Sequence, residues 1–450
     1  MAGAPARSSA DGFDAIVLAG GPHAGAKVLG LTLVERARRV VGKLGARRTL
    51  IVDDTTTAAE IAAWAAGRAG AAVLVVRGRD QVVSLGLGAP LVAGAATGAR
   101  RVAVDGAGAY LGALWAGPAE AGALIEAVAA GAGPDGFDDR GHATAWLAEG
   151  AAAVTAEAIA SHPARDRAER RGATRMLLGL ITKGEDGPVT RYVYRPVSRP
   201  ITRLLVHTPI SPNQVSIAVG IIGLIGCWFV AQPSQASLIL GMGLILAAGF
   251  IDGCDGELAR LRLQFSPIGA WLDTIIDELT TTVSFVALGI HCVRGSDLAW
   301  LPASIWVGLV AYLATIYVIY FFLIVVSKTG NSQHYAGKLD VIDDASGRGL
   351  RVVPSKPLPL PPWLVRATAF IPHIIRRDFI NLGSFVLALV NLYLINYAIM
   401  LVGGVVTILV IGPEHLRLRG QLRRLRALGV SPALLPAAPR PSTPAPAARP

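Results

Sequence analysis

Four aspartates lie close together in a stretch of the chain where charge is expensive, because strongly apolar runs precede and follow it. They are Asp252, Asp255, Asp273 and Asp277. On helices at 100° per residue, the first two share one face and the last two share another. The break at 264–267 includes Pro267, which suits a first helical turn. We therefore expect an antiparallel helical hairpin whose four carboxylates converge in two layers.

This hairpin predicts a metal site that serves phosphate chemistry. Four unpaired acids at membrane depth would cost on the order of 10 kcal/mol, so a cation must lie among them. Oxygen ligands without a nearby histidine favour Mg²⁺ or Mn²⁺. The inner faces carry Gly256, Ala259 and Gly269, which leave room for a phosphorylated ligand near the backbone. Ion pairs with Arg260 and Arg262 are the alternative, but two cations do not satisfy four carboxylates.

The spacing D-x2-D-G-x2-A-R-x8-G-x3-D-x3-D over 252–277 resembles the signature of the CDP-alcohol phosphotransferase family of integral membrane enzymes. The metal ligands that this resemblance implies are Asp252, Asp255, Asp273 and Asp277. It also makes Asp277 the candidate catalytic base. The residues that it implies for binding CDP within the hairpin are Gly256, Ala259, Arg260 and Gly269.

Three further polar residues lie where the resembled family contacts the CDP group. Asn213 and Ser216 open the first expected span, and Ser266 stands beside the hairpin turn. Helix capping is the alternative role for these residues.

Arginines near the membrane segments are candidates for binding the phosphate of an acceptor. Arg195 belongs to a run with an arginine every fourth residue, which is also typical of a headgroup anchor. Arg376 and Arg377 stand at the mouth of the fifth expected span, where positive charge equally sets topology.

Composition indicates that part of the chain lies in lipid. Of 450 residues, 52% are hydrophobic, and the mean hydropathy is +0.50, which exceeds what a soluble protein needs. The net charge is +11, and the basic residues flank apolar runs. Anionic lipid and phosphorylated substrates therefore explain this charge better than nucleic acid does. The six expected spans are 215–231, 237–258, 268–291, 303–326, 379–393 and 395–411.

Lysine and arginine distribution predicts the orientation of these spans in the cell (inner) membrane. The loops at 232–236 and 293–301 hold one arginine between them, whereas the opposite loops and the end of the chain are basic. Residues 1–13 lack an apolar core, so we expect no signal peptide. Both termini and the aspartates should therefore face the cytoplasm.

Residues 14 to about 110 alternate short β-rich runs with Ala-rich helical runs, which predicts an α/β domain. The expected strands are 15–18, 49–52, 72–76 and 101–104. The first runs into Gly20 and Gly21, as in sugar-nucleotidyltransferases, which this start resembles. The Gly-x-Arg and Pro-Lys elements of that family are missing, and Lys27 is the one candidate for phosphate binding. Cytidylyltransferase activity and an inactive scaffold both remain open.

The predicted fold is thus a nucleotidyltransferase-like α/β domain followed by an all-α polytopic membrane domain of about six transmembrane helices. The expected divisions are a disordered N-terminus at 1–13, the α/β domain at 14–170, a linker with a juxtamembrane helix at 171–213, the membrane domain at 214–412, and a basic, then Pro- and Ala-rich disordered tail at 413–450. The entry to the membrane domain, 183–213, resembles fused cytidylyltransferase and di-inositol-phosphate phosphate synthase proteins.

The resemblance implies metal-dependent transfer of a phosphoalcohol from a CDP-alcohol to an acceptor hydroxyl, with release of CMP. The fused domain favours an inositol phosphate or a similar polar phosphate as acceptor, and glycerol phosphate is the runner-up. A membrane prenyltransferase and a transporter or scaffold with vestigial acids are the alternatives from other classes. Whether the chain pairs into a homodimer is left open by the sequence.

Overall fold

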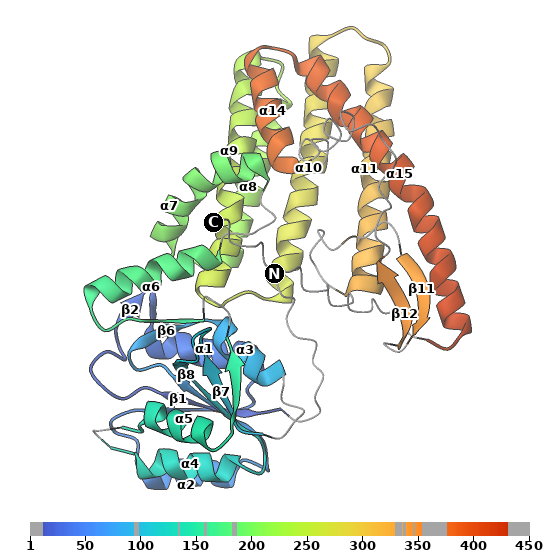
Figure 1. Cartoon of the computed structure of the whole chain (residues 1–450). Coiled ribbons are helices and arrows are strands. Elements are labelled where there is room, and N and C mark those ends of the chain that lie inside the picture. The colour runs from blue at the N-terminus through green and yellow to red at the C-terminus, as the bar shows by residue number, and fades with distance from the viewer. Residues whose placement is uncertain are drawn as a thin grey trace, which may run out of the picture. The chain divides into compact units, whose positions relative to one another are not determined.

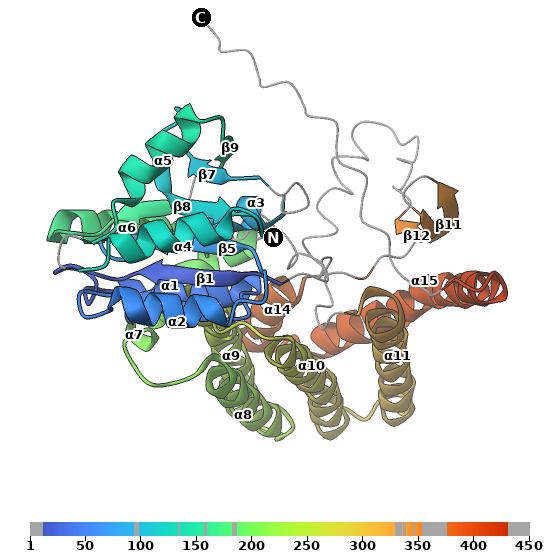
Figure 2. The same cartoon turned by 90° about the horizontal axis from the view of Figure 1, so that it is seen from below.

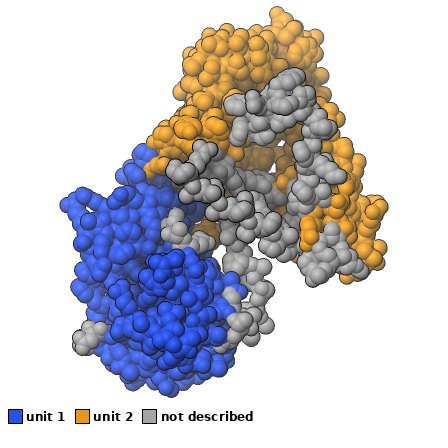
Figure 3. All heavy atoms as spheres, in the orientation of Figure 1, with its two compact units in different colours: residues 1–186, 200–210, 256–264 blue, residues 187–199, 211–255, 265–450 orange. Residues whose placement is uncertain are grey.

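The computed structural model describes residues 12–93, 99–133, 136–156, 160–181, 187–328, 335, 339–344, 347–352 and 376–430. The chain forms two compact units, coloured blue and orange in Figure 3. Unit 1 comprises residues 1–186, 200–210 and 256–264, and unit 2 comprises 187–199, 211–255 and 265–450.

Unit 1 is built on a mixed six-stranded sheet (Figure 1). In spatial order its strands are β4 (Thr49–Val52), β1 (Asp14–Leu18), β5 (Val73–Arg77), β8 (Tyr110–Ala116), β7 (Arg101–Val104) and β9 (Ala152–Thr155). β8 alone among these runs antiparallel to its neighbours. The four expected strands are confirmed within one residue at each end. β8 and β9 are two further strands of the sheet. The sequence did not predict them, because the chain from Leu111 onward is rich in alanine and glycine.

Helices cover both faces of this sheet. The helices of unit 1 that contact its strands are α1 (Leu33–Leu44), α2 (Ala58–Ala66), α3 (Leu85–Ala93), α4 (Ala121–Ala130) and α5 (Asp139–Ala148). Alternate residues of β1, β5, β8 and β7 enter two separate apolar clusters, one with α1 and α3 and the other with α2, α4 and α5. This three-layer arrangement is the α/β domain that the alternating pattern predicts.

Several shorter elements of unit 1 lie outside the main sheet. They are β2 (Lys27–Val28), β3 (Leu31–Thr32), β6 (Gln81–Val83), β10 (Ser161–Pro163) and α6 (Arg167–Leu180). Thr32 caps α1 by accepting a hydrogen bond from the backbone N–H of Glu35 at 3.1 Å.

Unit 2 contains most of the long apolar helices. By length and composition, five helices of the described residues are able to cross a membrane: Pro212–Val230 (α8), Gln235–Leu261 (α9), Pro267–Gly295 (α10), Leu301–Ser327 (α11, Leu301–Phe322, with the π-helical Leu323–Ser327) and Tyr393–Ala427 (α15). α8, α9 and α10 run side by side in both Figure 1 and Figure 2. A Cβ on Gly241 of α9 would lie 2.6 Å from the carbonyl oxygen of Gly226 on α8, so glycine is needed where these helices cross.

Five of the six expected spans are found among the described residues. The fifth expected span, 379–393, is instead α14 (Arg377–Leu389), a helix of 13 residues. Its length of about 20 Å falls short of a hydrocarbon core of about 30 Å. Asn391 has a left-handed φ of 58° between α14 and α15, so the two helices do not join into one span.

The last apolar helix continues into the basic stretch that follows it. α15 passes through Pro413 and ends at Ala427, so the basic residues from 413 to 427 lie on the same helix as the last span. Residues 431–450 lie outside the described part, and so do residues 363–375, whose sequence favours an interfacial helix.

Two helical segments precede the first span. A π-helical turn, Thr190–Tyr194, leads into α7 (Arg195–Leu205), whose residues from Pro200 onward belong to unit 1. A two-stranded hairpin, β11 (Leu339–Asp344) and β12 (Gly347–Val352), follows α11. Apolar residues of α11, α15 and this hairpin share one cluster, which includes Leu339, Leu350, Leu418 and Leu422.

Candidate active site

Three of the four predicted aspartates converge between α9 and α10. Ligand oxygens of Asp252, Asp255 and Asp273 all lie within 4.8 Å of one another. Asp255 is buried, and the other two are half-buried. Spacing by three residues on α9 puts two of them on one face, and the hairpin turn brings α10 alongside. The donor set is therefore rich in oxygen and compact enough for one divalent cation.

Ser216 of α8 supports this cluster. Its hydroxyl is buried and donates a hydrogen bond to the carboxylate of Asp255. A carboxylate held in this way keeps a fixed orientation toward its neighbours. The sequence predicted Ser216 as a CDP contact, which stays a prediction. The structure adds its hydrogen bond to Asp255.

The fourth aspartate is joined to the others through an arginine. Arg377, at the first position of α14, donates from one guanidinium nitrogen to Asp252 at 3.1 Å and pairs with Asp277 through another. The structure thus brings one predicted acceptor-phosphate residue into contact with two of the predicted aspartates. Sequence spacing gave no sign of this contact, since 100 residues separate Asp277 from Arg377.

A donor set for a hard cation also requires that sulfur stays out of the site. Cys254 lies between two of the aspartates in sequence, but its thiol is buried and donates to the carbonyl of Ser198 at 3.4 Å. The three clustered ligands therefore offer oxygen only, and this set fits Mg²⁺ or Mn²⁺ better than a softer metal.

The N-terminal ends of α8 and α10 meet at small and polar residues. Ser266 caps α10 by accepting from the N–H of Gly269 at 3.0 Å, so the capping role that its sequence position allowed is present. The cap of α8 is Ser211, which leaves the side chain of Asn213 for other contacts. The amide oxygen of Asn213 lies 3.1 Å from where a Cβ on Gly269 would stand, so a larger residue at Gly269 would crowd it.

The predicted CDP-binding residues near the end of α9 form one helical face. Gly256 and Arg260 are one turn apart, and a guanidinium nitrogen of Arg260 lies 3.3 Å from where a Cβ on Gly256 would stand. Ala259 adds only a methyl group beside them. A side chain longer than alanine at Gly256 would displace Arg260.

The other two candidate acceptor residues lie in unit 2 near the start of α14. A guanidinium nitrogen of Arg195 lies 3.6 Å from where a Cβ on Gly253 would stand, and Arg195 is itself buried. Arg376 forms a 3.6 Å ion pair with Asp378. Asp378 also accepts a hydrogen bond from the hydroxyl of Thr190, and its carbonyl accepts one from Tyr194 at 3.0 Å. These last contacts fix the π-helical turn against α14, and sequence reasoning missed them.

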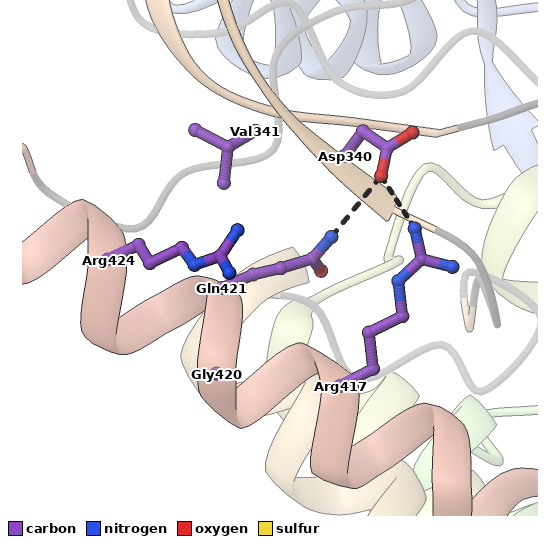
Figure 4. Close-up of a pocket in the computed structure, with 6 residues that line it drawn as sticks. All are labelled: Asp340, Val341, Arg417, Gly420, Gln421 and Arg424. Carbon is purple, nitrogen blue, oxygen red and sulfur yellow. Dashed lines mark hydrogen bonds and ion pairs between the residues drawn. The ribbon is translucent and has the colours of Figure 1, made fainter.

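A separate polar pocket of about 670 Å³ lies between the β11–β12 hairpin and the basic end of α15 (Figure 4). Its lining residues are Asp340, Val341, Arg417, Gly420, Gln421 and Arg424. Arg417 pairs with Asp340 at 2.8 Å, so much of its charge is neutralised. None of the predicted site residues lines this pocket.

In the α/β domain, the carboxylate of Asp54 binds the backbone at Gly21, just after strand β1. The backbone N–H of Gly21 donates to both carboxylate oxygens of Asp54, at 2.9 and 3.0 Å. Arg77, at the end of the neighbouring strand β5, is paired with Asp80 at 2.7 Å. Asp105, which follows strand β7, accepts from the N–H groups of Ala107 and Ala109 at 2.8 Å and thus holds a turn.

Comparison with known proteins agrees with the geometry of unit 2. Residues 209–346 match the family model described as CDP-alcohol phosphatidyltransferase. A "Bifunctional IPC transferase and DIPP synthase" of Rubrobacter xylanophilus is 39% identical over 173 residues, which cover 37% of this chain and 38% of that protein. A protein of the same name from Thermococcus kodakarensis is 34% identical over 153 residues, or 34% and 33% of the two chains.

A shorter relative matches too. An "Archaetidylinositol phosphate synthase" of Methanothermobacter thermautotrophicus is 32% identical over 94 residues, which cover 20% of this chain and 47% of that protein. In all three comparisons the match spans less than half of the relative. The matched family region contains the aspartate hairpin and the start of α8, so this part of the chain is similar to the CDP-alcohol phosphatidyltransferase family.

Proposed function

We propose that this multi-pass membrane protein transfers a phosphoalcohol from a CDP-alcohol to the hydroxyl of a polar acceptor, with release of CMP. The observation that carries the proposal is the meeting of Asp252, Asp255 and Asp273 within 4.8 Å at the spacing of the family signature. Relatives named as IPC transferase, DIPP synthase and archaetidylinositol phosphate synthase favour an inositol phosphate, or a similar phosphorylated polyol, as acceptor. A glycerol phosphate acceptor is the runner-up.

The clustered carboxylates would hold Mg²⁺ or Mn²⁺, with Asp277 as a further ligand. A bound divalent ion would neutralise the pyrophosphate of the donor and stabilise charge on the leaving CMP. Arg260 and the bare backbone at Gly256 would bind the donor's pyrophosphate, and Asn213 and Gly269 would line the CDP group at the helix ends.

The chemical step follows from the roles of these side chains. The oxygen of the acceptor hydroxyl attacks the β-phosphorus and forms a new P–O bond, while the bond from that phosphorus to the bridging oxygen breaks. CMP leaves with the bridging oxygen, and the acceptor becomes a phosphodiester. Asp277 takes the proton from the hydroxyl as general base.

Arg377 links acceptor binding to this step. A carboxylate paired with a guanidinium is a weak base, because the positive charge favours its ionised form. The phosphate of the acceptor is a competing partner for Arg377, and Arg195 and Arg376 add positive charge nearby. Arg377 would therefore release Asp277 when it takes the acceptor phosphate, so the base becomes active with acceptor in place.

For the α/β domain we propose a scaffold role without cytidylyltransferase activity. Asp54 occupies the N–H of Gly21, where a nucleotide phosphate would bind, and Arg77 is neutralised by Asp80. A triphosphate would have to displace one carboxylate and approach another, which costs Coulomb energy. Incubation of the purified protein with CTP and phosphorylated polyols should release no pyrophosphate.

The test of the main proposal is CMP release by the purified protein. A radiolabelled CDP-donor is offered with Mg²⁺ and a panel of inositol phosphates, glycerol phosphates and non-phosphorylated polyols. We expect metal-dependent CMP release that requires a phosphorylated acceptor. A transporter or scaffold would release no CMP with any pair, and a prenyltransferase would require an isoprenyl diphosphate. We further propose that the aspartates and both termini face the cytoplasm, which labelling of single cysteines introduced in the loops from each side of the membrane would test.

A further inference from the structure

The end of helix α9 is completed by side chains from the α/β domain, all within unit 1. Arg36 and Arg39 lie one turn apart on α1. Arg36 donates to the carbonyl of Leu261 at 2.7 Å, and Arg39 donates to the carbonyl of Arg262 at 2.8 Å. Arg36 is 2% exposed. These residues are about 220 positions away from the carbonyls in sequence, so the contact exists only in the folded chain.

The two carbonyls are the ones that the helix leaves without internal partners. α9 ends in a Schellman turn, in which Gln264 donates to the carbonyl of Ala259 at 2.8 Å and Leu263 donates to that of Arg260 at 3.3 Å. The next two carbonyls, of Leu261 and Arg262, have no place in that turn. Arg36 and Arg39 supply donors to both, and their positive charge favours the negative end of the helix dipole.

Leu263 adds an apolar anchor to the same turn. It takes a left-handed φ of 55°, which usually requires glycine in this position. Its side chain is 8% exposed and belongs to the apolar cluster that α1 and α3 form with the sheet. Burial of the leucine therefore compensates for a backbone conformation that it would otherwise avoid.

Arg262 ties a third segment to the turn. Its guanidinium is buried and donates to the carbonyls of Leu205 at 2.8 Å, Val206 at 3.1 Å and Ile210 at 2.5 Å. The guanidinium of Arg262 thus binds backbone carbonyls at the end of α7 and just after it. Arg262 is therefore not the ion-pair partner of the aspartates that the sequence allowed. The guanidinium groups of Arg36, Arg39 and Arg262 therefore all stabilise this turn by donating to main-chain carbonyls.

We infer that Arg36 and Arg39 of the α/β domain are positioning residues for donor binding, because they fix the end of α9 on which Gly256 and Arg260 lie. This inference rests on the proposed function, in which these two residues bind the pyrophosphate of a CDP-alcohol. Burial lowers the pKa of Arg36 to about 10, so it stays cationic at neutral pH. Through these backbone contacts at the end of α9 the α/β domain supports donor binding, which gives the fusion of the two parts a physical reason.

The test compares Arg36→Met and Arg39→Met with a matched control, Arg101→Met. Arg101 is also buried in the α/β domain and donates to a backbone carbonyl, that of Leu91, at 3.0 Å. All three changes remove a guanidinium and keep an apolar chain. We expect Arg36→Met to raise the KM for the CDP-donor about tenfold with a smaller change in kcat. Arg36→Lys should recover part of the loss.

Hydrogen exchange gives a readout that does not depend on activity. The amides of Leu263 and Gln264 should exchange faster in Arg36→Met and Arg39→Met than in Arg101→Met. Arg39 is more exposed than Arg36, so its variant tests the inference even where Arg36→Met does not fold. Equal donor KM values and equal exchange at the turn in all three variants would overturn the inference. A wild-type protein that releases no CMP refutes the proposed function instead, while the exchange data still decide whether the arginines hold the turn.

Discussion

Arg377 lies 3.1 Å from Asp252, and the same guanidinium also pairs with Asp277 on the facing helix. A single cation therefore satisfies two carboxylates that the sequence assigned to metal. An acceptor phosphate that binds Arg377 would therefore release both carboxylates from their ion pairs.

Replacement of Arg377 by glutamine should raise the KM for a phosphorylated acceptor at least tenfold, because a charge-assisted contact to phosphate is lost. The KM for the CDP-donor should change little, and Mg²⁺ should bind no more weakly, since the variant removes a competing cation. Steady-state kinetics and calorimetric titration with Mg²⁺ measure the three quantities. Arg294→Gln, at the opposite end of α10, is the control. Weaker Mg²⁺ binding with an unchanged acceptor KM would make Arg377 a structural counter-ion only.

Asp277→Asn should leave binding of metal and CDP-alcohol largely intact and lower turnover about 10²- to 10⁴-fold, as expected for loss of a general base. Asp252→Asn should weaken both metal binding and turnover, because its carboxylate belongs to the cluster. CMP release and Mn²⁺ binding by electron paramagnetic resonance distinguish the two effects, with the exposed Asp297→Asn as control. Normal turnover in Asp277→Asn would remove this residue from the role of base.

Ser216→Ala removes the hydroxyl that orients Asp255, so it should weaken metal binding about 10- to 100-fold while the protein stays folded. The concentration of Mg²⁺ needed for half-maximal CMP release reports this change. Ser237→Ala, near the other end of α9, should leave that concentration unchanged. An unaltered Mg²⁺ requirement in Ser216→Ala would mean that Asp255 needs no such support.

Leu263 gives an unusual order of stability. Leu263→Ala should lower the free energy of unfolding by on the order of 2 kcal/mol, because buried side-chain volume is lost. Leu263→Gly should be less damaging than Leu263→Ala, since glycine adopts the left-handed φ of 55° without strain. Thermal unfolding of the purified variants checks the order. At Val41, buried in helix α1, the order should reverse, because alanine suits a helix better than glycine.

The stability of the α/β domain should depend on pH through Glu35. Hydrogen bonds from Arg38, and then from Arg39, lower the pKa of Glu35 from 4.5 to about 2. The folded state therefore binds this proton less readily than the unfolded state, so the ion pairs stabilise the protein fully above about pH 4.5 and progressively less as the pH falls toward 2.

Glu35→Gln should cost less than about 1 kcal/mol at neutral pH, because the pairs are partly exposed. The difference from wild type should shrink as the pH falls from 4.5 toward 2. Melting curves across this range measure it, with the exposed Glu126→Gln as control. A difference that stays constant with pH would show that the charge of Glu35 does not stabilise the fold.

The sequence by itself determined the chemistry of the hairpin. Residue type and a helical period place Asp252 and Asp255 on one face, and Pro267 marks the start of the next helix, because these are local properties of the chain. The four expected strands of the α/β domain followed from equally local patterns. Strand β8 was missed, since Gly112, Ala113 and Ala116 weaken its local strand signal and the strand depends on pairing with β5 and β7.

Only the tertiary structure decided which distant residues complete the site. Arg377 reaches Asp252 and Asp277, and Arg36 reaches the carbonyl of Leu261, across separations that no spacing rule covers. The length of α14 was also a tertiary outcome, because apolar composition alone did not reveal the turn at Asn391. Such contacts depend on how helices and strands pack, and packing energy is shared among residues far apart in the chain. Local periodicity therefore specified the ligands, and the fold specified their partners.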